Sequence, residues 1–251
     1  MKLKNLTELV GKTGYMSKVY RGEGDDNKFY LLKRNTCRPT PEQLEFMYWL
    51  MKNRHPSLLT PVEIRGEIGT PLEEIYPYIG PSSMLLDNFL DGIFPYGDHR
   101  VMGGWNFRLA LKIMNQIAFG LGLINGAGFI KHDLKPKDVF VNAATLDTIV
   151  FDYNCVRRKY ILNEGIDTWN DVPPEYRRGN TEIDFTFDVY QVGRLCRAMI
   201  YGLNTPQEAE PRIEVPDSVL ETIAKATSSD KSQRYRDCRE LQKAIARLAV
   251  R

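Results

Sequence analysis

The 251-residue chain lacks the features that mark several large classes of protein. Its four cysteines stand far apart with no paired spacing, which argues against a zinc site or a redox motif and predicts reduced thiols. The first residues, MKLKNLTELVGK, lack the apolar segment of a secretion signal. No apolar run approaches the roughly 20 residues that a membrane span needs. We therefore expect a cytoplasmic protein without a membrane span.

The sequence also has little excess of either charge. It contains 34 Lys and Arg residues against 32 Asp and Glu residues, and its net charge is +2. Nucleic acids and anionic membranes call for a concentrated basic patch, and the sequence shows none, so we expect no nucleic-acid partner. The content of 43% apolar and 26% charged residues is that of an ordinary globular protein. The length and composition favour one domain built from two lobes.

The first 80 residues are typical of a small sheet with one helix. The runs LTELVG, SKVYRG and KFYLLKR alternate with turn residues and predict strands. A helix is expected to begin at Thr40 and Pro41, because Thr can cap a helix and Pro fits its first turn. The runs PVEIRGEI and EEIYPYI predict two more strands. The smaller lobe, residues 1–80, is therefore expected to hold about five strands and one helix.

Residues 81–251 are expected to be mainly helical. From Trp105 onward, apolar residues recur three or four positions apart on one helical face. Two short apolar runs at 139–142 and 148–153 predict a hairpin. Further helices are expected over the ranges 186–201, 216–227 and 236–249. Together the two parts predict an α+β fold with two lobes.

The strongest motif is GFIKHDLKPKDVFVN, from Gly128 to Asn142. It resembles the catalytic loop of protein kinases, in which His-Arg-Asp-Leu is followed by three residues and Asn. The resemblance implies a bilobal kinase fold that uses ATP with Mg²⁺ or Mn²⁺. It also implies that Asp133 is the catalytic aspartate and Lys135 the lysine of serine/threonine kinases. In this family residues 1–80 would form the nucleotide-binding lobe, and residues 81–251 the catalytic and substrate lobe.

Three positions in this motif depart from the family pattern. Lys131 and His132 stand where the family has His and Arg, and Asp138 replaces the metal-binding Asn. Asp138 keeps an oxygen ligand for a hard divalent cation but adds one negative charge beside the phosphates. Losing the Arg makes control by phosphorylation of the activation loop less expected, and His132 would replace it only weakly, when protonated.

A second match lies 19 residues after Asp133, where FDYN resembles the Asp-Phe-Gly motif of the family. It implies that Asp152 is the principal metal ligand. Tyr153 replaces Phe, and Asn154 replaces Gly at a position where Asn tolerates positive φ best among the other residues. Taken without the resemblance, Asp-Tyr-Asn is equally consistent with a simple turn.

The segment DTWNDVPPE, residues 167–175, resembles the family's stretch from Thr to Ala-Pro-Glu. It implies that Thr168 bridges Asp133 and Lys135, which makes these three the catalytic set. Glu175 takes the place of the family's structural glutamate and is expected to pair with Arg234.

The match is thinner in the smaller lobe. SKVY and YLLK imply that Val19 lies above the adenine and that Lys33 binds the α and β phosphates. Glu45 is expected to hold this lysine, although Glu42 competes for the same role. In the phosphate-covering loop the three glycine positions are occupied by Lys12, Gly14 and Ser17. Gly14 alone keeps the pattern in which backbone amides approach the phosphates closely, so we expect a looser lid.

These matches favour an ATP-dependent serine/threonine protein kinase with divergent motifs. The alternative is a pseudokinase that binds nucleotide or a protein partner without efficient phosphoryl transfer, as the changed motifs and missing glycines would allow. A kinase-fold enzyme acting on a small molecule is a third possibility. The partner is expected to be a protein substrate or a regulatory protein.

Overall fold

The computed structural model describes residues 1–9, 17–66, 70–93, 104–162, 172–179, 181–203 and 210–249. Contacts within the chain divide it into two units, Met1–Pro81 (unit 1) and Ser82–Arg251 (unit 2). The division lies one residue from the lobe boundary expected at 80/81.

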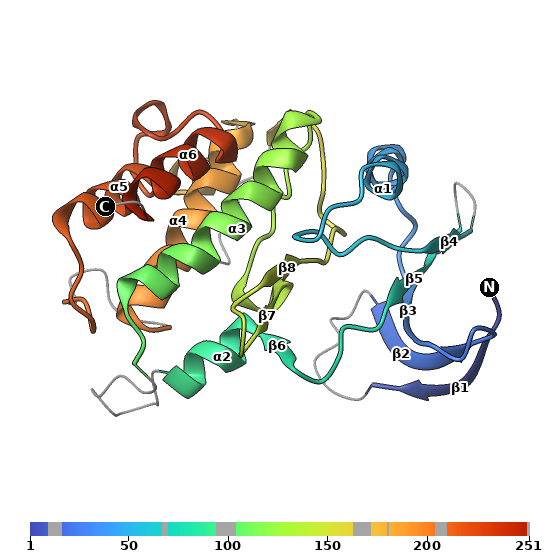
Figure 1. Cartoon of the computed structure of the whole chain (residues 1–251). Helices are drawn as coiled ribbons and strands as arrows, with labels where there is room; N and C mark the ends of the chain where they lie inside the picture. The colour runs from blue at the N-terminus through green and yellow to red at the C-terminus, as the bar shows by residue number, and fades with distance from the viewer. Residues whose placement is uncertain are drawn as a thin grey trace. The chain divides into compact units, whose positions relative to one another are not determined.

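Unit 1 is built on one antiparallel sheet with the strand order β1-β2-β3-β5-β4 (Figure 1). The strands are β1 (Leu3–Glu8), β2 (Ser17–Gly24), β3 (Phe29–Asn35), β4 (Glu63–Arg65) and β5 (Glu73–Pro77). A tight turn joins β2 to β3, with Asn27 at a φ of 60°. The five-stranded sheet expected from the sequence is confirmed.

The single helix of unit 1, α1 (Pro41–Lys52), begins where the sequence predicts. Thr40 Oγ1 accepts a hydrogen bond from Gln43 N at 3.2 Å, and Thr40 N donates to Gln43 Oε1 at 2.7 Å. This capping box satisfies two backbone N–H groups, and Pro41 fits the first turn without losing a hydrogen bond. Its buried face consists of Leu44, Phe46, Met47 and Leu50.

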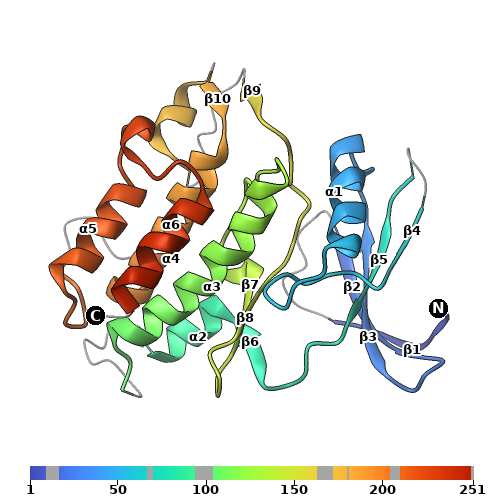
Figure 2. The same ribbon diagram turned by 45° about the horizontal axis from the view of Figure 1, so that its top comes forward.

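Unit 2 is mainly helical. Its helices are α2 (Leu86–Ile93), α3 (Phe107–Gly126), α4 (Phe185–Tyr201), α5 (Asp217–Ala226) and α6 (Cys238–Ala249). Figures 1 and 2 show α3 running alongside α4 and α6. The helices predicted after the hairpin are confirmed to within two residues at each end. The sequence did not predict α2.

The short strands of unit 2 form two small sheets. β6 (Ser83–Leu85), β7 (Val139–Asn142) and β8 (Thr148–Val150) form one, and β9 (Tyr160–Leu162) pairs with β10 (Thr181–Ile183) in the other. The predicted hairpin is therefore confirmed, but its second strand ends at Val150. Single 3₁₀ turns lie at η1 (Pro136–Asp138), η2 (Pro174–Arg178) and η3 (Lys231–Gln233).

The central helix of unit 2 is α3. Asn106 caps it by accepting hydrogen bonds from the backbone N–H groups of Arg108 and Leu109. By length and apolar content α3 is the one helix among the described residues that could cross a membrane. However, 56% of its most apolar 18-residue stretch is buried inside the fold. At Gly122 it approaches α6 closely, because an added Cβ would lie 2.9 Å from Arg239 Cγ. These contacts are those of a core helix.

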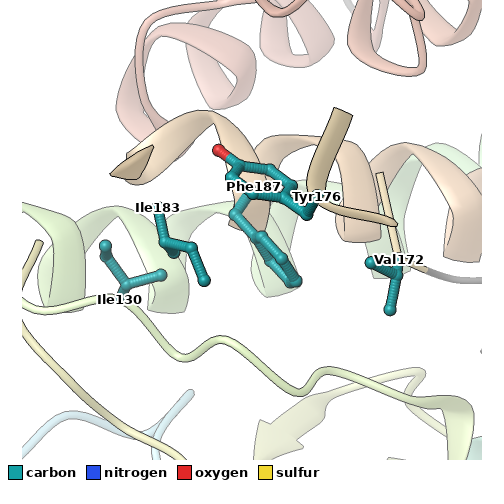
Figure 3. Packing of buried hydrophobic residues seen from close by; sticks show 5 residues of the cluster. All are labelled: Ile130, Val172, Tyr176, Ile183 and Phe187. Carbon is teal, nitrogen blue, oxygen red and sulfur yellow. The ribbon is translucent and has the colours of Figure 1, made fainter. Parts of the chain in front are cut away.

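A buried apolar cluster packs Ile130, which precedes the Asp133 loop, against α4 (Figure 3). It contains Ile130, Val172, Tyr176, Ile183 and Phe187. The rings of Tyr176 and Phe187 lie 4.9 Å apart at 47°. The cluster therefore fixes the entry of the chain into the loop that follows Ile130.

All four cysteines of the chain are free thiols, as expected.

The close approach of α4 to α5 gives a test of the packing. A Cβ added at Gly193 would lie 2.7 Å from Thr227 Cγ2 and 2.9 Å from Ala226 Cβ. We expect Gly193→Ala to lower the free energy of unfolding by about 1–3 kcal/mol through overpacking. Gly92, in α2, has nothing within 4 Å of an added Cβ, so Gly92→Ala is the matched control and should stabilise by up to about 1 kcal/mol. Urea unfolding of both variants measures this; equal effects would contradict the packing argument.

Candidate functional site

The loop that carries Asp133 is held by a buried carboxylate on α4. The side chain of Asp188 is fully buried, and its Oδ2 accepts hydrogen bonds from Lys131 N at 2.9 Å and from Asn125 Nδ2 at 2.8 Å. Its Oδ1 accepts from His132 N at 3.0 Å. Burial raises the pKa of Asp188, and these three donors oppose that shift. Two successive backbone amides are thus aimed at one carboxylate.

The same helix holds the next part of the loop. Gln191, one helical turn after Asp188, accepts a hydrogen bond from Leu134 N through Oε1 at 3.0 Å. Ile130 forms an isolated antiparallel bridge with Arg157, with N···O distances of 2.7 and 3.0 Å in the two directions. The loop is therefore fixed on both sides of Asp133.

The structure brings Asp133 and Lys135 together, as the sequence implies. Lys135 Nζ lies 2.7 Å from Asp133 Oδ1 and 2.8 Å from Oδ2. The Asp133 side chain keeps 33% of its surface exposed, whereas Lys135 keeps 11%. Cys155 Sγ lies 4.0 Å from Asp133 Oδ2, and burial raises the pKa of this thiol. An accessible carboxylate beside a fixed cation can orient an attacking hydroxyl and neutralise charge that develops on a phosphate.

Lys131 is entirely buried next to this pair. Its Nζ donates hydrogen bonds to the backbone oxygens of Asp133 at 2.9 Å and Asp152 at 2.6 Å. It also lies 3.7 Å from Asp138 Oδ2. Lys131, which replaces the histidine of the family pattern, therefore connects the Asp133 segment of the candidate site to the Asp152 segment.

Asp138, the candidate metal ligand in η1, is also buried. Its Oδ2 accepts a hydrogen bond from Lys135 N at 3.0 Å and faces Lys131. Desolvation raises the pKa of Asp138 to about 6; Lys131 opposes the shift, and the carboxylates of Asp152 and Asp133 add to it. Both of these contacts use Oδ2, so Oδ1 takes no part in them.

Asp152, the other candidate metal ligand, follows β8 in an unusual backbone conformation. Its φ is 58°, in the left-handed region, and the preceding Phe151 N donates to Asp138 O at 2.9 Å. Tyr153 is buried, and its hydroxyl donates to Val150 O at 2.7 Å. The exchange of Phe for Tyr therefore adds a satisfied hydrogen bond rather than an unpaired polar group.

The acidic side chains fit a metal only in part. Among the described residues, no group of three or more His, Cys, Asp or Glu side chains is arranged to hold a metal ion by itself. Asp138 and Asp152 interact electrostatically and supply hard oxygen donors. Mg²⁺ commonly takes one or two carboxylates and completes its shell with substrate phosphates and water. The pair therefore fits a cation that arrives with a nucleotide.

His132 cannot supply the charge of the arginine it replaces at neutral pH. Its ring packs on Phe187 at 4.8 Å, and its Nε2 lies 3.1 Å from the hydroxyl of Tyr160. Burial, and then the nearby Arg157, lower its pKa to about 4. The φ of His132 is 69°, which lets its N–H point at Asp188. The expected weak substitution for arginine therefore fails, because the imidazole is neutral.

In unit 1, the candidate nucleotide-binding residues lie on the sheet. Val19 on β2 pairs with Lys33 on β3, and Lys33 pairs with Glu74 on β5, so the three share one face. Glu74 is 5% exposed and accepts hydrogen bonds from Asn35 Nδ2 at 2.7 Å and the Tyr76 hydroxyl at 2.5 Å. A buried carboxylate beside Lys33 was not expected.

The roles of Glu45, Gly14 and Thr168 also stay predictions. Glu45 and its competitor Glu42 both lie on α1, and the choice between them stays open. Gly14 and Thr168 lie outside the described residues.

The predicted ion pair between Glu175 and Arg234 is confirmed. Arg234 Nη1 and Nη2 lie 2.7 and 2.8 Å from the two carboxylate oxygens, and Arg234 Nε donates to Ser228 O at 2.8 Å. A bidentate pair with a buried guanidinium ties η2 to the segment before α6.

Sequence reasoning missed the anchoring residues. Asp188 and Gln191 lie three positions apart in DVYQVG, within the helix expected over residues 186–201. Polar residues at that spacing on an otherwise apolar helix face share one side and signal a buried polar contact. Lys131 was treated only as the loss of a histidine, although a lysine followed by apolar and acidic neighbours can be a buried cation.

Comparison with known proteins identifies the fold. No protein-family model matches the chain, and no curated protein matches its sequence. A solved structure, the Cydia pomonella granulovirus kinase PK-1, is similar with a TM-score of 0.70 and 14% sequence identity. The match covers 96% of this chain and 92% of the viral chain. The chain therefore has a protein-kinase-like α+β fold, as expected.

The buried state of His132 predicts a pH dependence of stability. Its pKa of about 4 in the folded chain lies below the ordinary histidine pKa of 6.5, so between these two pH values the unfolded chain takes up a proton that the folded chain does not. We expect the free energy of unfolding to fall by roughly 3 kcal/mol between pH 6.5 and 4 from this residue. His132→Phe should remove that part of the slope in urea unfolding measured across the window.

Tyr160→Phe is the matched control, because it removes the hydrogen bond to Nε2 and leaves the imidazole buried. Burial is the largest cause of the low pKa, so this variant should keep the slope. An identical slope in His132→Phe and the wild type would show that His132 does not titrate as described.

Proposed function

We propose that the chain is an ATP-dependent serine/threonine protein kinase with divergent motifs. The observation that carries the proposal is the close pairing of Asp133 with Lys135, on a loop that Asp188 and Gln191 hold by backbone hydrogen bonds. Phosphoryl transfer depends mainly on positioning and electrostatic stabilisation, and a rigid carboxylate–ammonium pair supplies both.

In the proposed reaction Asp133 orients the hydroxyl of a protein substrate and accepts its proton. The substrate oxygen bonds to the γ-phosphorus of ATP, and the bond to the β–γ bridging oxygen breaks, so that ADP leaves. Lys135 neutralises charge on the transferred group. Asp152 and Asp138 would hold Mg²⁺ or Mn²⁺, which would neutralise the phosphate charge. Lys33 would contact the α and β phosphates.

A pseudokinase is the second candidate, and the position of Asp138 favours it. The Oδ2 oxygen of this residue is engaged by Lys131 and by Lys135 N, which ties part of a metal ligand into the fold. Such a protein would bind nucleotide or a regulatory protein partner without efficient transfer.

The test is transfer of labelled phosphate from ATP to a mixed protein substrate with Mg²⁺ or Mn²⁺. We expect Asp133→Asn to lower the rate by about 10²- to 10⁴-fold, because the carboxylate that accepts the proton is lost. Asp147→Asn, an exposed change in the turn between β7 and β8, is the matched control and should transfer at the wild-type rate.

Thermal unfolding with ATP and metal separates the two candidates. Wild-type transfer no faster than that of Asp133→Asn would refute the kinase. If ATP and metal still stabilised that wild type, and Lys33→Met abolished the stabilisation, the pseudokinase would be supported.

A further inference from the structure

We propose that Lys131 and Asp138 form an internal charge pair that replaces two neutral residues of the kinase pattern, and that Lys131 positions the Asp133 and Asp152 segments. The two departures are then one coupled change rather than two separate defects. The proposal stands on the geometry of unit 2 and does not require that the protein transfers phosphate.

The first observation is the burial and bonding of Lys131. The side chain is 0% exposed, and a buried ammonium is costly unless its hydrogens are used. Two of them are donated to backbone oxygens that lie 19 residues apart in sequence, those of Asp133 and Asp152. Lys131 therefore links the segment with the candidate catalytic carboxylate to the segment with the candidate metal ligand.

The second observation is the charge that faces it. Asp138 keeps 6% of its side chain exposed, and its Oδ2 lies 3.7 Å from Lys131 Nζ. Asp133, Asp152 and Lys135 are the other charged groups that act on Asp138. Of the two lysines that act on Asp138, Lys131 is wholly buried, whereas Lys135 keeps 11% of its side chain exposed. Water therefore screens the charge of Lys131 less than that of Lys135.

The two substitutions balance. Relative to the kinase pattern, Lys131 adds one positive charge in place of a His and Asp138 adds one negative charge in place of an Asn. Either change alone would bury an uncompensated charge, whereas both together leave the sum unchanged. The positive charge of Lys131 thereby offsets the extra negative charge that Asp138 brings to the candidate metal site.

A double-mutant cycle tests the pair. Met replaces Lys131, because it is unbranched and neutral, and Asn replaces Asp138 with the same shape. We expect Lys131→Met to lower the Tm by about 5 °C or more, and Asp138→Asn to lower it in the wild-type background. In the Lys131→Met background, Asp138→Asn should instead raise the Tm, because it removes the uncompensated carboxylate.

The sign of that last change decides the matter. If Asp138→Asn lowers the Tm equally in both backgrounds, the two residues act independently and the proposal is overturned. Where Lys131→Met alone is insoluble, recovery of soluble protein in the double variant supports the pair. A double variant as insoluble as the single one overturns it.

A second readout distinguishes charge balance from simple packing, and it rests on the proposed metal site. The Mn²⁺ concentration for half-maximal thermal stabilisation is measured with ADP present, so that no turnover occurs. Lys131→Met should lower this concentration about 3-fold or more, because the site becomes more negative, and Asp138→Asn should raise it. The double variant should return toward the wild type.

The Glu175–Arg234 pair provides the matched control in the same unit. Glu175→Gln, Arg234→Met and their double variant should show coupling in Tm without any change in the Mn²⁺ response. An unchanged Mn²⁺ response across the Lys131 and Asp138 variants, in a wild type that binds ADP and Mn²⁺, would refute charge balance at the site. A wild type that shows no stabilisation by ADP and Mn²⁺ counts against the proposed function alone, because the Tm cycle is measured without metal.

Discussion

Hydrogen bonds from successive backbone amides to the buried carboxylate of Asp188 determine the geometry of the candidate site. A carboxylate is stable in a buried position only when donors surround it, and Lys131 N, His132 N and Asn125 Nδ2 fill that role. For both amides to point the same way, His132 must adopt a left-handed backbone, which a non-glycine residue does at a cost. The side chains of Lys131 and Asp133 take their directions from that turn.

Much of the architecture followed from local patterns. The capping box at Thr40 and the hairpin across residues 139–150 are set by residues close in sequence, whose propensities act regardless of the rest of the fold. The Glu175–Arg234 pair was also predicted, although it joins distant segments, because the family resemblance supplied both positions.

The residues that sequence reasoning missed act through tertiary contacts. The role of Asp188 depends on which backbone amides lie opposite its helix face, and no periodicity contains that information. Lys131 was misjudged for a related reason, since whether a lysine is solvated or buried depends on the fold around it. The sequence did not predict α2 and β6, because segments of eight and three residues show little periodicity. The assignment of Asp138 and Asp152 as metal ligands rests on the family resemblance and stays a prediction.

The hydroxyl of Tyr153 has a consequence for the mobility of the Asp152 segment. With its hydrogen bond to Val150 O, the ring is tethered to the end of β8 as well as packed. Moving this ring out of its place would break that hydrogen bond as well as the packing, and a typical hydrogen bond contributes about 1 kcal/mol to stability. A phenylalanine in the same place would meet only the packing term. The Asp152 segment is therefore held at Tyr153 by a hydrogen bond that a phenylalanine could not make.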